Sequence, residues 1–263
     1  MRPDDVDHIE AIAFEAWPAV ETRDEDGWIV RYGNGFSRRL NSVTISSKAA
    51  IDDVPGRVQA AGTWLGARGV GTVIRVTTAS PPSIDETLAR RGFRTEGETV
   101  VMTSGLAGPD AVGAPGALVG GAEPSAAWLA CQQDWLGITD VPAWRTVLSR
   151  VEAPVVFAET HDGASVASVG LGVVRRRWLG IFEVATDPER RRRGHATRLA
   201  RAMIDWARMS GATSAYLQVV ASNRPAIELY RGMGFTEAYH YWYRRLPADV
   251  GPDTTRAGLD RLS

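Results

Sequence analysis

The spacing of apolar residues divides the chain into short helices and strands that alternate along its length. Apolar side chains recur at helical spacing in residues 4–19, 52–67, 84–91, 124–135, 141–151 and 196–207. Runs rich in β-branched and aromatic residues predict strands at 27–32, 42–45, 73–77, 99–102, 117–120, 155–160, 165–174, 178–186 and 217–220. Turn residues separate them: Gly33-Asn34-Gly35 lies between the strands 27–32 and 42–45, and His161-Asp162-Gly163 between 155–160 and 165–174. This alternation predicts an α/β fold.

Composition narrows the class of protein. The chain has 263 residues, 44% of them hydrophobic, and a net charge of −1, which is ordinary for a globular protein of one or two domains. The near-zero charge argues against a nucleic-acid or membrane partner. No apolar run approaches the roughly 20 residues that span a bilayer, and the amino terminus lacks the apolar core of a signal peptide, so we expect a cytoplasmic protein. No metal site is expected. The single cysteine, Cys131, is better explained as a packed helix residue than as a catalytic thiol.

A basic, glycine-containing turn joins the strand 178–186 to the helix that follows it. Residues 187–194 read Asp-Pro-Glu-Arg-Arg-Arg-Arg-Gly. The free N–H groups of a first helical turn and the positive end of the helix dipole both favour an anion above the turn. Gly194 allows close approach of the backbone, and arginines can close on phosphate oxygens. Taken alone, the segment could also be a solvated basic turn.

A second motif follows the strand 217–220. It contains Asn223, then a short helix with Ala226 and Tyr230, and it ends at Gly234-Phe235. Together with Arg191-x-x-Gly194-x-Ala196, this order resembles the GNAT acetyltransferases, whose pyrophosphate signature is Gln/Arg-x-x-Gly-x-Gly/Ala. The resemblance covers residues 117–246. It implies a mixed twisted sheet flanked by helices, in the order β-α-α-β-β-β-α-β-α-β.

The resemblance also implies a site for acetyl-CoA. In this family, the strands that correspond to 178–186 and 217–220 start side by side and then splay apart. The pantetheine arm lies in the gap, and the pyrophosphate lies on the basic turn. An N–H near Val184 would polarise the thioester carbonyl. The expected cofactor-binding residues are Val184, Ala185, Thr186, Arg191, Arg192, Gly194, His195, Ala196, Thr197, Asn223, Ala226 and Tyr230.

Two residues are candidates for proton transfer. The resemblance implies that the hydroxyl of Tyr230 protonates the departing CoA sulfur, although a core tyrosine with its hydroxyl bonded elsewhere is the alternative. Glu183 is the carboxylate of the buried strand and could act as a base toward the acceptor amine, or hold a water that does. Strand alternation could instead turn it away from the substrate. We expect Arg190 and Arg193 to face solvent, and His195 to contribute its backbone.

The amino-terminal part repeats the plan in shortened form. A strand, a short helix ending at Gly92-Phe93 and a further strand follow one another as in 217–246. Residues 1–105 therefore resemble a degenerate GNAT-like half, which lacks the Arg-x-x-Gly-x-Ala turn and the tyrosine and is not expected to bind CoA pyrophosphate. An unrelated α/β cap is the alternative. Residues 106–116, rich in Gly, Ala and Pro, are predicted to be a linker to a catalytic half at 117–246, and 247–263 a tail.

The acceptor is predicted to be a small polar amine. An arginine pair with an amide on the amino-terminal hairpin could hold a carboxylate, which would suit an amino acid such as glutamate. The hairpin cluster is Trp28, Arg31, Arg38, Arg39 and Asn41, and the candidate substrate-binding residues are Trp28, Arg31, Arg38 and Asn41. Exposed hairpin charges are the alternative. Two-GNAT chains with a silent amino-terminal half resemble the mycothiol synthases, and chains with this hairpin resemble actinobacterial proteins linked to N-acetylglutamate synthesis. The predicted activity is transfer of an acetyl group from acetyl-CoA to a primary amine; a silent acetyl-CoA sensor, or a basic interaction protein, is the alternative.

Overall fold

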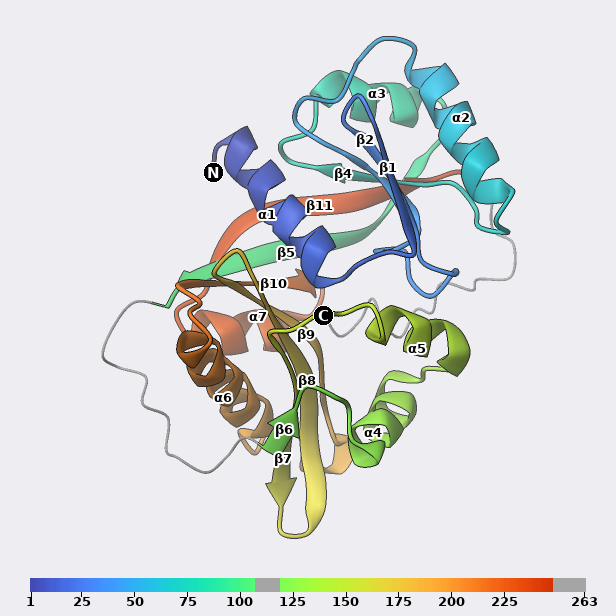
Figure 1. Cartoon of the computed structure of the whole chain (residues 1–263). Helices are drawn as coiled ribbons and strands as arrows, with labels where there is room; N and C mark the ends of the chain where they lie inside the picture. Colours follow the sequence, from blue (N-terminus) through green and yellow to red (C-terminus); the bar gives the residue numbers. More distant parts are fainter. Residues whose placement is uncertain (107–118, 248–263) are drawn as a thin grey trace. The chain divides into compact units, whose positions relative to one another are not determined.

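The computed structural model describes residues 1–106 and 119–247, and these fall into two compact units (Figure 1). The first contains residues 1–100, 142–150 and 238–247, and the second contains 101–106, 119–141 and 151–237. Apart from residues 106 and 247, the predicted linker and tail lie outside the described residues. Within the described ranges, no helix combines the length and apolar character needed to cross a membrane.

The first unit is a mixed sheet with helices on both faces. Its elements are α1 (Pro3–Ala16), β1 (Glu21–Glu25), β2 (Trp28–Tyr32), β3 (Ser42–Ile45), α2 (Val54–Gly66), β4 (Val73–Thr77), α3 (Pro82–Arg90), β5 (Arg94–Gly105), α5 (Val141–Leu148) and β11 (Thr236–Arg245). The strand order is β1-β2-β3-β4-β11-β5. Strands β3 and β4 are parallel, whereas β1–β2, β2–β3 and β4–β11 are antiparallel.

Strand β1 is absent from the sequence prediction, which paired 27–32 with 42–45 through a turn at Gly33-Asn34-Gly35. The tight hairpin lies one strand earlier, where Asp26 and Gly27 have φ of 53° and 81° and join β1 to β2. Every residue of β1 is exposed and most are charged, so no apolar alternation marks it. The Asp-Gly pair, a strong hairpin signal, could have revealed it.

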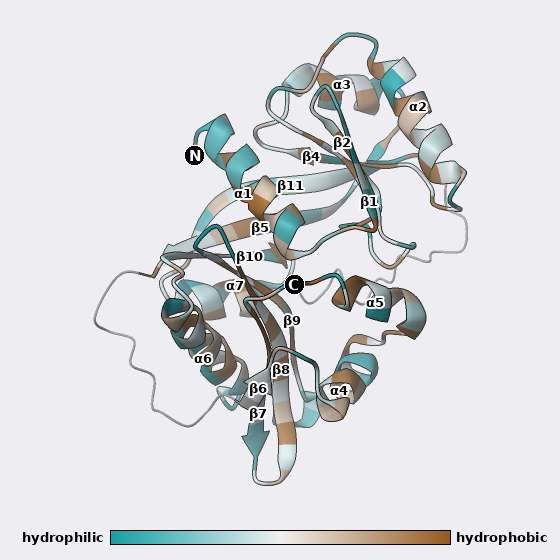
Figure 2. Cartoon of the chain, viewed as in Figure 1, coloured by the Kyte–Doolittle hydropathy of each residue, from teal (hydrophilic) through white to brown (hydrophobic). Residues whose placement is uncertain are grey.

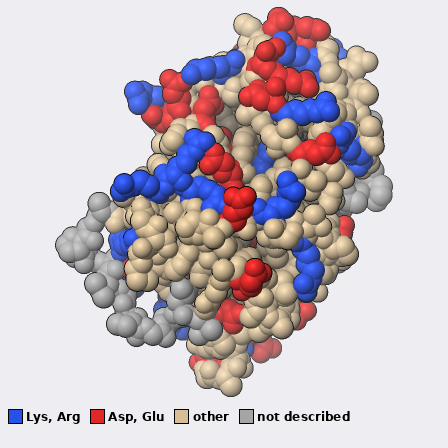
Figure 3. Space-filling model, viewed as in Figure 1, with Lys and Arg blue, Asp and Glu red and all other residues tan. Residues whose placement is uncertain are grey.

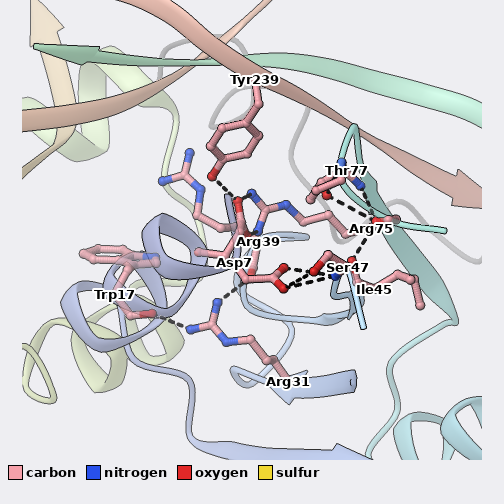
Figure 4. A network of polar contacts seen from close by, with 12 residues as sticks. Asp7, Trp17, Arg31, Arg39, Ile45, Ser47, Arg75, Thr77 and Tyr239 are labelled. Atoms are coloured by element: carbon pink, nitrogen blue, oxygen red, sulfur yellow. Dashed lines mark hydrogen bonds and ion pairs between the residues drawn. The ribbon is translucent and has the colours of Figure 1, made fainter. Parts of the chain in front are cut away.

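The two faces of this sheet differ in polarity. Alternate residues of β2, β3 and β4 join α2 and α3 in an apolar core, while the residues between them form a buried polar face. On that face Arg75 pairs bidentately with Glu10 of α1, which also accepts the hydroxyl hydrogen of Tyr239 (Figure 4). Arg31 donates to the carbonyls of Trp17 and Arg39 at 2.6 and 3.1 Å. Burial and the nearby Arg75 lower the pKa of Arg31 to about 9.

The second unit contains β6 (Val119–Gly121), α4 (Ala126–Leu136), β7 (Val155–Asp162), β8 (Ser165–Arg175), β9 (Trp178–Thr186), a 3₁₀ turn (Pro188–Arg190), α6 (His195–Met209), β10 (Ser214–Val220) and α7 (Arg224–Arg231). Its strands run in the order β10-β9-β8-β7-β6, with β9 and β10 parallel. Helices α4 and α6 cover opposite faces (Figure 1). The apolar stripe of α6 packs on β8 and β9, and its polar side is visible in Figure 2.

Two segments of the predicted catalytic half belong to the first unit. Strand β11 pairs with β4, and its Arg244 forms an ion pair with Asp85 of α3 at 2.7 Å. After α5, Arg150 donates to the carbonyl of Ala19 at 3.1 Å. The compact units therefore differ from the predicted ranges 1–105 and 117–246 in these two segments and in residues 101–105, which belong to the second unit. Otherwise the helices and strands occur in the predicted order, with boundaries shifted by a few residues.

Candidate active site

Strands β9 and β10 separate part of the way along their length. They pair in parallel from Ser214 opposite Trp178 to Leu217 opposite Ile181, and the ladder ends there. Strand β9 continues to Thr186 and β10 to Val220 without pairing to each other. The backbone beyond Ile181 therefore has an open side toward β10, as the resemblance implied.

A β-bulge lies on β9 just beyond this fork. The register with β8 passes from Leu171 opposite Phe182 to Val169 opposite Ala185, so Gly170 faces two residues of β9, Glu183 and Val184. Glu183 has φ of 52°, a left-handed conformation that costs a non-glycine residue roughly 1–2 kcal/mol. Bulges are frequent beside active sites because they redirect backbone and side-chain groups.

The bulge is held by helix α4. The side-chain amide of Gln132 donates to the carbonyl oxygen of Glu183 at 2.6 Å, and the indole N–H of Trp128 donates to the carbonyl of Gly170 at 3.0 Å. Both side chains are fully buried. The sequence prediction did not include Gln132 because a lone glutamine in an amphipathic helix carries no functional signal.

The first turn of α6 is open. Gly194 is its N-cap, with φ of 78° and no side-chain capping bond. The first bond of the helix joins the N–H of Arg198 to the carbonyl of Gly194 at 3.0 Å, so the N–H groups of residues 195–197 precede the intrahelical ladder. A Cβ added at Gly194 would meet only a guanidinium nitrogen of Arg198, at 3.9 Å. These features make a suitable anion site.

The four arginines before Gly194 have different environments. Arg191 and Arg192 are exposed, and neither bonds to any other residue in the described part of the chain. Arg193 is also exposed, 3.9 Å from Asp162. Arg190, which was expected to face solvent, is half-buried and forms an ion pair with Asp187. The expectation was wrong for Arg190 because the 3₁₀ turn places its guanidinium over the Asp187 carboxylate.

His195 begins α6 and its imidazole is buried. Arg198 donates to its Nδ1 at 2.5 Å, so that nitrogen is unprotonated. Burial, and secondarily the positive charge of Arg198, lower the pKa of His195 below its ordinary value of 6.5. The imidazole is therefore engaged within the turn, and the expectation that His195 contributes its backbone N–H to a ligand stays a prediction.

The second motif lies where β10 passes into α7. Asn223 is the N-cap of α7, and its side-chain oxygen accepts the N–H of Ala226 at 3.3 Å. Tyr230 is buried and packs against the ring of Phe235 at 5.7 Å. Its hydroxyl has no hydrogen-bond partner among the described residues, unlike that of a core tyrosine bonded elsewhere. Burial raises the pKa of Tyr230, which keeps the hydroxyl protonated at neutral pH.

The thiol of Cys131 is unsuited to nucleophilic chemistry. Burial and the carboxylate of Glu159 raise its pKa to about 11, so the thiol remains protonated at neutral pH. Glu159 itself is buried on β7, where it accepts a hydrogen bond from Ser125, the N-cap of α4. These contacts agree with a packed helix position for Cys131.

The corresponding region of the first unit is closed by its own side chains. Asp53, the N-cap of α2, accepts the N–H of Gly56 at 3.1 Å. Beyond the parallel pair β3–β4, the hydroxyl of Ser80 donates to the carbonyl of Ile45 at 2.7 Å and accepts the N–H of Thr77 at 2.9 Å. Asp53 and Ser80 thus occupy the two places in the first unit, and the absence of a CoA pyrophosphate site there stays a prediction.

The proposed acceptor group on the amino-terminal hairpin is not brought together. Trp28 lies in the apolar core and donates to the carbonyl of Ala50 at 2.9 Å, whereas Arg31 lies on the buried polar face. Arg38 pairs with Glu96 at 2.9 Å. Asn41 accepts the N–H groups of residues 33 and 35 at 2.9 and 3.1 Å. These contacts stabilise the first unit, and the four side chains do not form a carboxylate clamp.

Comparison with known proteins agrees with this geometry. The family model described as "Probable histone acetyltransferase Rv0428c C-terminal" matches residues 4–244. The chain is 25% identical over 246 residues to the uncharacterized N-acetyltransferase YobR of Bacillus subtilis, covering 92% of this chain and 98% of that protein. The chain is also 41% identical, over a segment of 58 residues, to the ribosomal protein bS18-alanine N-acetyltransferase of Salmonella typhimurium. This segment covers 22% of this chain and 39% of that protein.

Solved structures share the fold. A GCN5-related N-acetyltransferase from Kribbella flavida has a TM-score of 0.70 at 13% identity, covering 94% of this chain and 96% of that one. A tandem GNAT protein from the clavulanic acid biosynthesis pathway has a TM-score of 0.54 at 12% identity, covering 92% and 96%. With the family match over most of the chain, this protein is a tandem-GNAT acyltransferase of the Rv0428c C-terminal family.

Proposed function

We propose that the second unit binds acetyl-CoA and transfers its acetyl group to the primary amine of a small polar acceptor. One observation carries the proposal: the fork between β9 and β10 opens beside an α6 amino terminus that no described side chain caps. An extended pantetheine arm could pair with the open side of β9 as an added strand would. The pyrophosphate would then meet the N–H groups of residues 195–197, with Arg191 and Arg192 closing over it.

Each group in the site has a step to perform. The amine nitrogen attacks the thioester carbon, and the C–S bond breaks as the new C–N bond is completed. An N–H near Val184, presented by the bulge, would stabilise the negative charge that develops on the carbonyl oxygen. Tyr230 would donate its proton to the departing thiolate. Glu183, or a water that it holds, would accept the proton that the amine loses.

The names of the matching family and of the relatives indicate different acceptors. The matching family is described as a "Probable histone acetyltransferase", and the relative in Salmonella typhimurium is named a ribosomal protein bS18-alanine N-acetyltransferase. The resemblance to proteins linked to N-acetylglutamate synthesis instead suggested an amino acid such as glutamate, although the hairpin group offered for its carboxylate is not assembled. Acidic and basic side chains are interspersed on the face that Figure 3 shows, and the net charge is −1, so this face offers no broad acidic surface to a lysine-rich protein tail. A small amine therefore remains our proposed acceptor.

An amine panel tests the proposal. Release of free CoA from acetyl-CoA is measured with glutamate, with a peptide that begins with alanine and with a lysine-rich histone-tail peptide. We expect faster release with an amino acid than with either peptide. If every amine leaves CoA release at the background rate while acetyl-CoA still raises the melting temperature, the chain is a sensor rather than an enzyme. Without CoA binding, the site assignment itself is wrong.

A further inference from the structure

The bulge on β9 depends on side chains from another element. Glu183 is a non-glycine residue in a left-handed conformation, so the local sequence does not favour the bulge by itself. Trp128 and Gln132 lie four residues apart and therefore on one side of α4. One donates to the carbonyl of Gly170 and the other to that of Glu183, which are the residues that face each other at the bulge.

Only the nitrogen of the Gln132 amide forms a hydrogen bond among the described residues. A carbonyl oxygen can only accept, so the contact with Glu183 orients the amide with Nε2 toward β9 and Oε1 away from it. That Oε1 is buried and has no hydrogen-bond partner in the described part of the chain. A buried acceptor without a partner is unfavourable for folding. A methionine of similar shape would remove the unpaired acceptor but also the donor to the carbonyl of Glu183, so that single bond to β9 is what the glutamine contributes at this position.

We propose that Gln132 is a positioning residue for acetyl transfer, and that its amide fixes the bulge so that the N–H near Val184 points at the thioester carbonyl. This inference rests on the proposed function and deepens it. Gln132 need not touch the acetyl group. It acts through the backbone of Glu183, and loss of its N–H would let the bulge relax toward a regular ladder, in which the N–H groups of β9 point elsewhere.

The test measures the thioester carbonyl directly, without knowing the acceptor. Acetyl-CoA labelled with ¹³C at the carbonyl is bound to the full chain, and its infrared band is compared with that of free acetyl-CoA. A hydrogen bond to the carbonyl oxygen shifts the band to lower frequency. We expect this shift in the wild type, its loss in Gln132→Met and its retention in Gln133→Met. Gln133 is the matched control, since among the described residues its amide donates only to the carbonyl of Leu129 within α4, at 3.2 Å.

A second variant separates bulge geometry from a general loss of packing. Glycine adopts the left-handed conformation readily, so Glu183→Gly should keep the bulge without help from α4. The double variant Glu183→Gly/Gln132→Met should therefore recover the band shift that Gln132→Met loses. The double variant also allows the measurement if the single variant is too unstable to purify. Equal shifts in the wild type and Gln132→Met, or no recovery in the double variant, would overturn the inference.

Kinetic constants distinguish a positioning role of Gln132 from a purely structural one, which would not change kcat in the folded protein. With an amine that the panel identifies, Gln132→Met should lower kcat on the order of 10–100-fold, while KM for acetyl-CoA changes by less than about threefold. A rise in KM with unchanged kcat would place Gln132 in cofactor binding and overturn the positioning role. If the wild type binds acetyl-CoA without any band shift, the proposed thioester contact fails, and the inference fails with it. If the wild type and Gln132→Met both show the band shift, the inference about Gln132 is wrong, but the proposed function stands.

Discussion

Asp53 and Gly194 occupy the same place in the two halves of the chain. Each is the N-cap of the helix that connects two parallel strands, and each has left-handed backbone, with φ of 44° and 78°. Asp53 uses its own carboxylate to bond the N–H of Gly56, whereas Gly194 has no side chain and leaves the first turn of α6 open. In the first unit, the carboxylate of Asp53 thus occupies the position at the helix terminus that an external anion could occupy in the second unit.

The contrast leads to a prediction for Gly194→Asp. A carboxylate at this position would compete with the pyrophosphate for the same N–H groups and repel its charge. We expect acetyl-CoA binding to fall below detection by titration calorimetry. The fold should survive because a Cβ at Gly194 meets only a flexible arginine side chain, although the positive φ costs roughly 1–2 kcal/mol.

Gly211 offers the matched control at the other end of α6. It has φ of 85°, and a Cβ there would meet nothing within 4 Å. Gly211→Asp should therefore lose at least as much stability as Gly194→Asp, since its carboxylate lies at the negative end of the α6 dipole, but keep its affinity for acetyl-CoA. Equal affinities of the two variants for acetyl-CoA would show that the pyrophosphate does not bind at the amino terminus of α6.

Much of the fold was predictable because local patterns and tertiary packing agree. The apolar stripe of α6 and the buried run of β9 are both recognisable from spacing alone. The exposed strand β1 was missed because its pairing depends on the turn at Gly27 and not on apolar alternation. The inclusion of β11 in the first sheet was also missed, since strand pairing between distant segments leaves no local signal.

The site divides in the same way. The turn that ends at Gly194 and the helix that carries Tyr230 follow motifs that are contiguous in sequence, so their geometry could be anticipated. The bulge at Glu183 could not, because it depends on Gln132, 51 residues away along the chain. The hairpin group failed for a related reason. Residues close in sequence, such as Trp28 and Arg31, face opposite sides of their strand and cannot form one pocket.

Tyr230→Phe should separate chemistry from stability. The hydroxyl of Tyr230 bonds to no described residue, so its removal should leave the free energy of unfolding unchanged or slightly higher. Loss of the proton donor should lower kcat by roughly 10²–10⁴-fold, with acetyl-CoA affinity retained. Stopped assays of CoA release, together with urea unfolding, measure both quantities.

For Tyr239→Phe we expect the reverse of Tyr230→Phe, a loss of stability without a loss of activity. The hydroxyl of Tyr239 donates to the buried carboxylate of Glu10, so its loss should lower stability by about 1–3 kcal/mol. Acetyl transfer should be unaffected in the folded protein. If Tyr230→Phe behaved like Tyr239→Phe, Tyr230 would be a structural residue and the proton donor would have to be sought elsewhere.

His195 should make stability depend on pH. The folded protein holds the pKa of His195 below 6.5, while in the unfolded chain the imidazole titrates at about that value. Above this pH the imidazole is neutral in both states and contributes no difference. As pH falls below about 6.5, the unfolded chain takes up a proton that the folded protein resists, and stability falls.

The variant His195→Asn isolates this effect. Asparagine can accept the hydrogen bond of Arg198 through its side-chain oxygen, but it does not titrate. The fall in urea midpoint between pH 7.5 and 5.5 should be smaller in His195→Asn than in the wild type. His8→Asn, at an exposed position of α1, should retain the wild-type fall. A wild-type fall in His195→Asn would show that other groups cause the acid sensitivity.

Glu10→Gln should be the most destabilising of these substitutions. Glu10 is the carboxylate that pairs with Arg75 on the buried polar face, and Arg31 lies on the same face with main-chain carbonyls as its acceptors (Figure 4). Removing the negative charge leaves two buried guanidinium groups without compensation, which typically costs about 3–5 kcal/mol. Urea unfolding measures the loss. Asp5→Asn breaks the exposed pair with Arg2 on the same helix and should change stability little. Similar small losses in both variants would mean that water or an anion already compensates the buried charge.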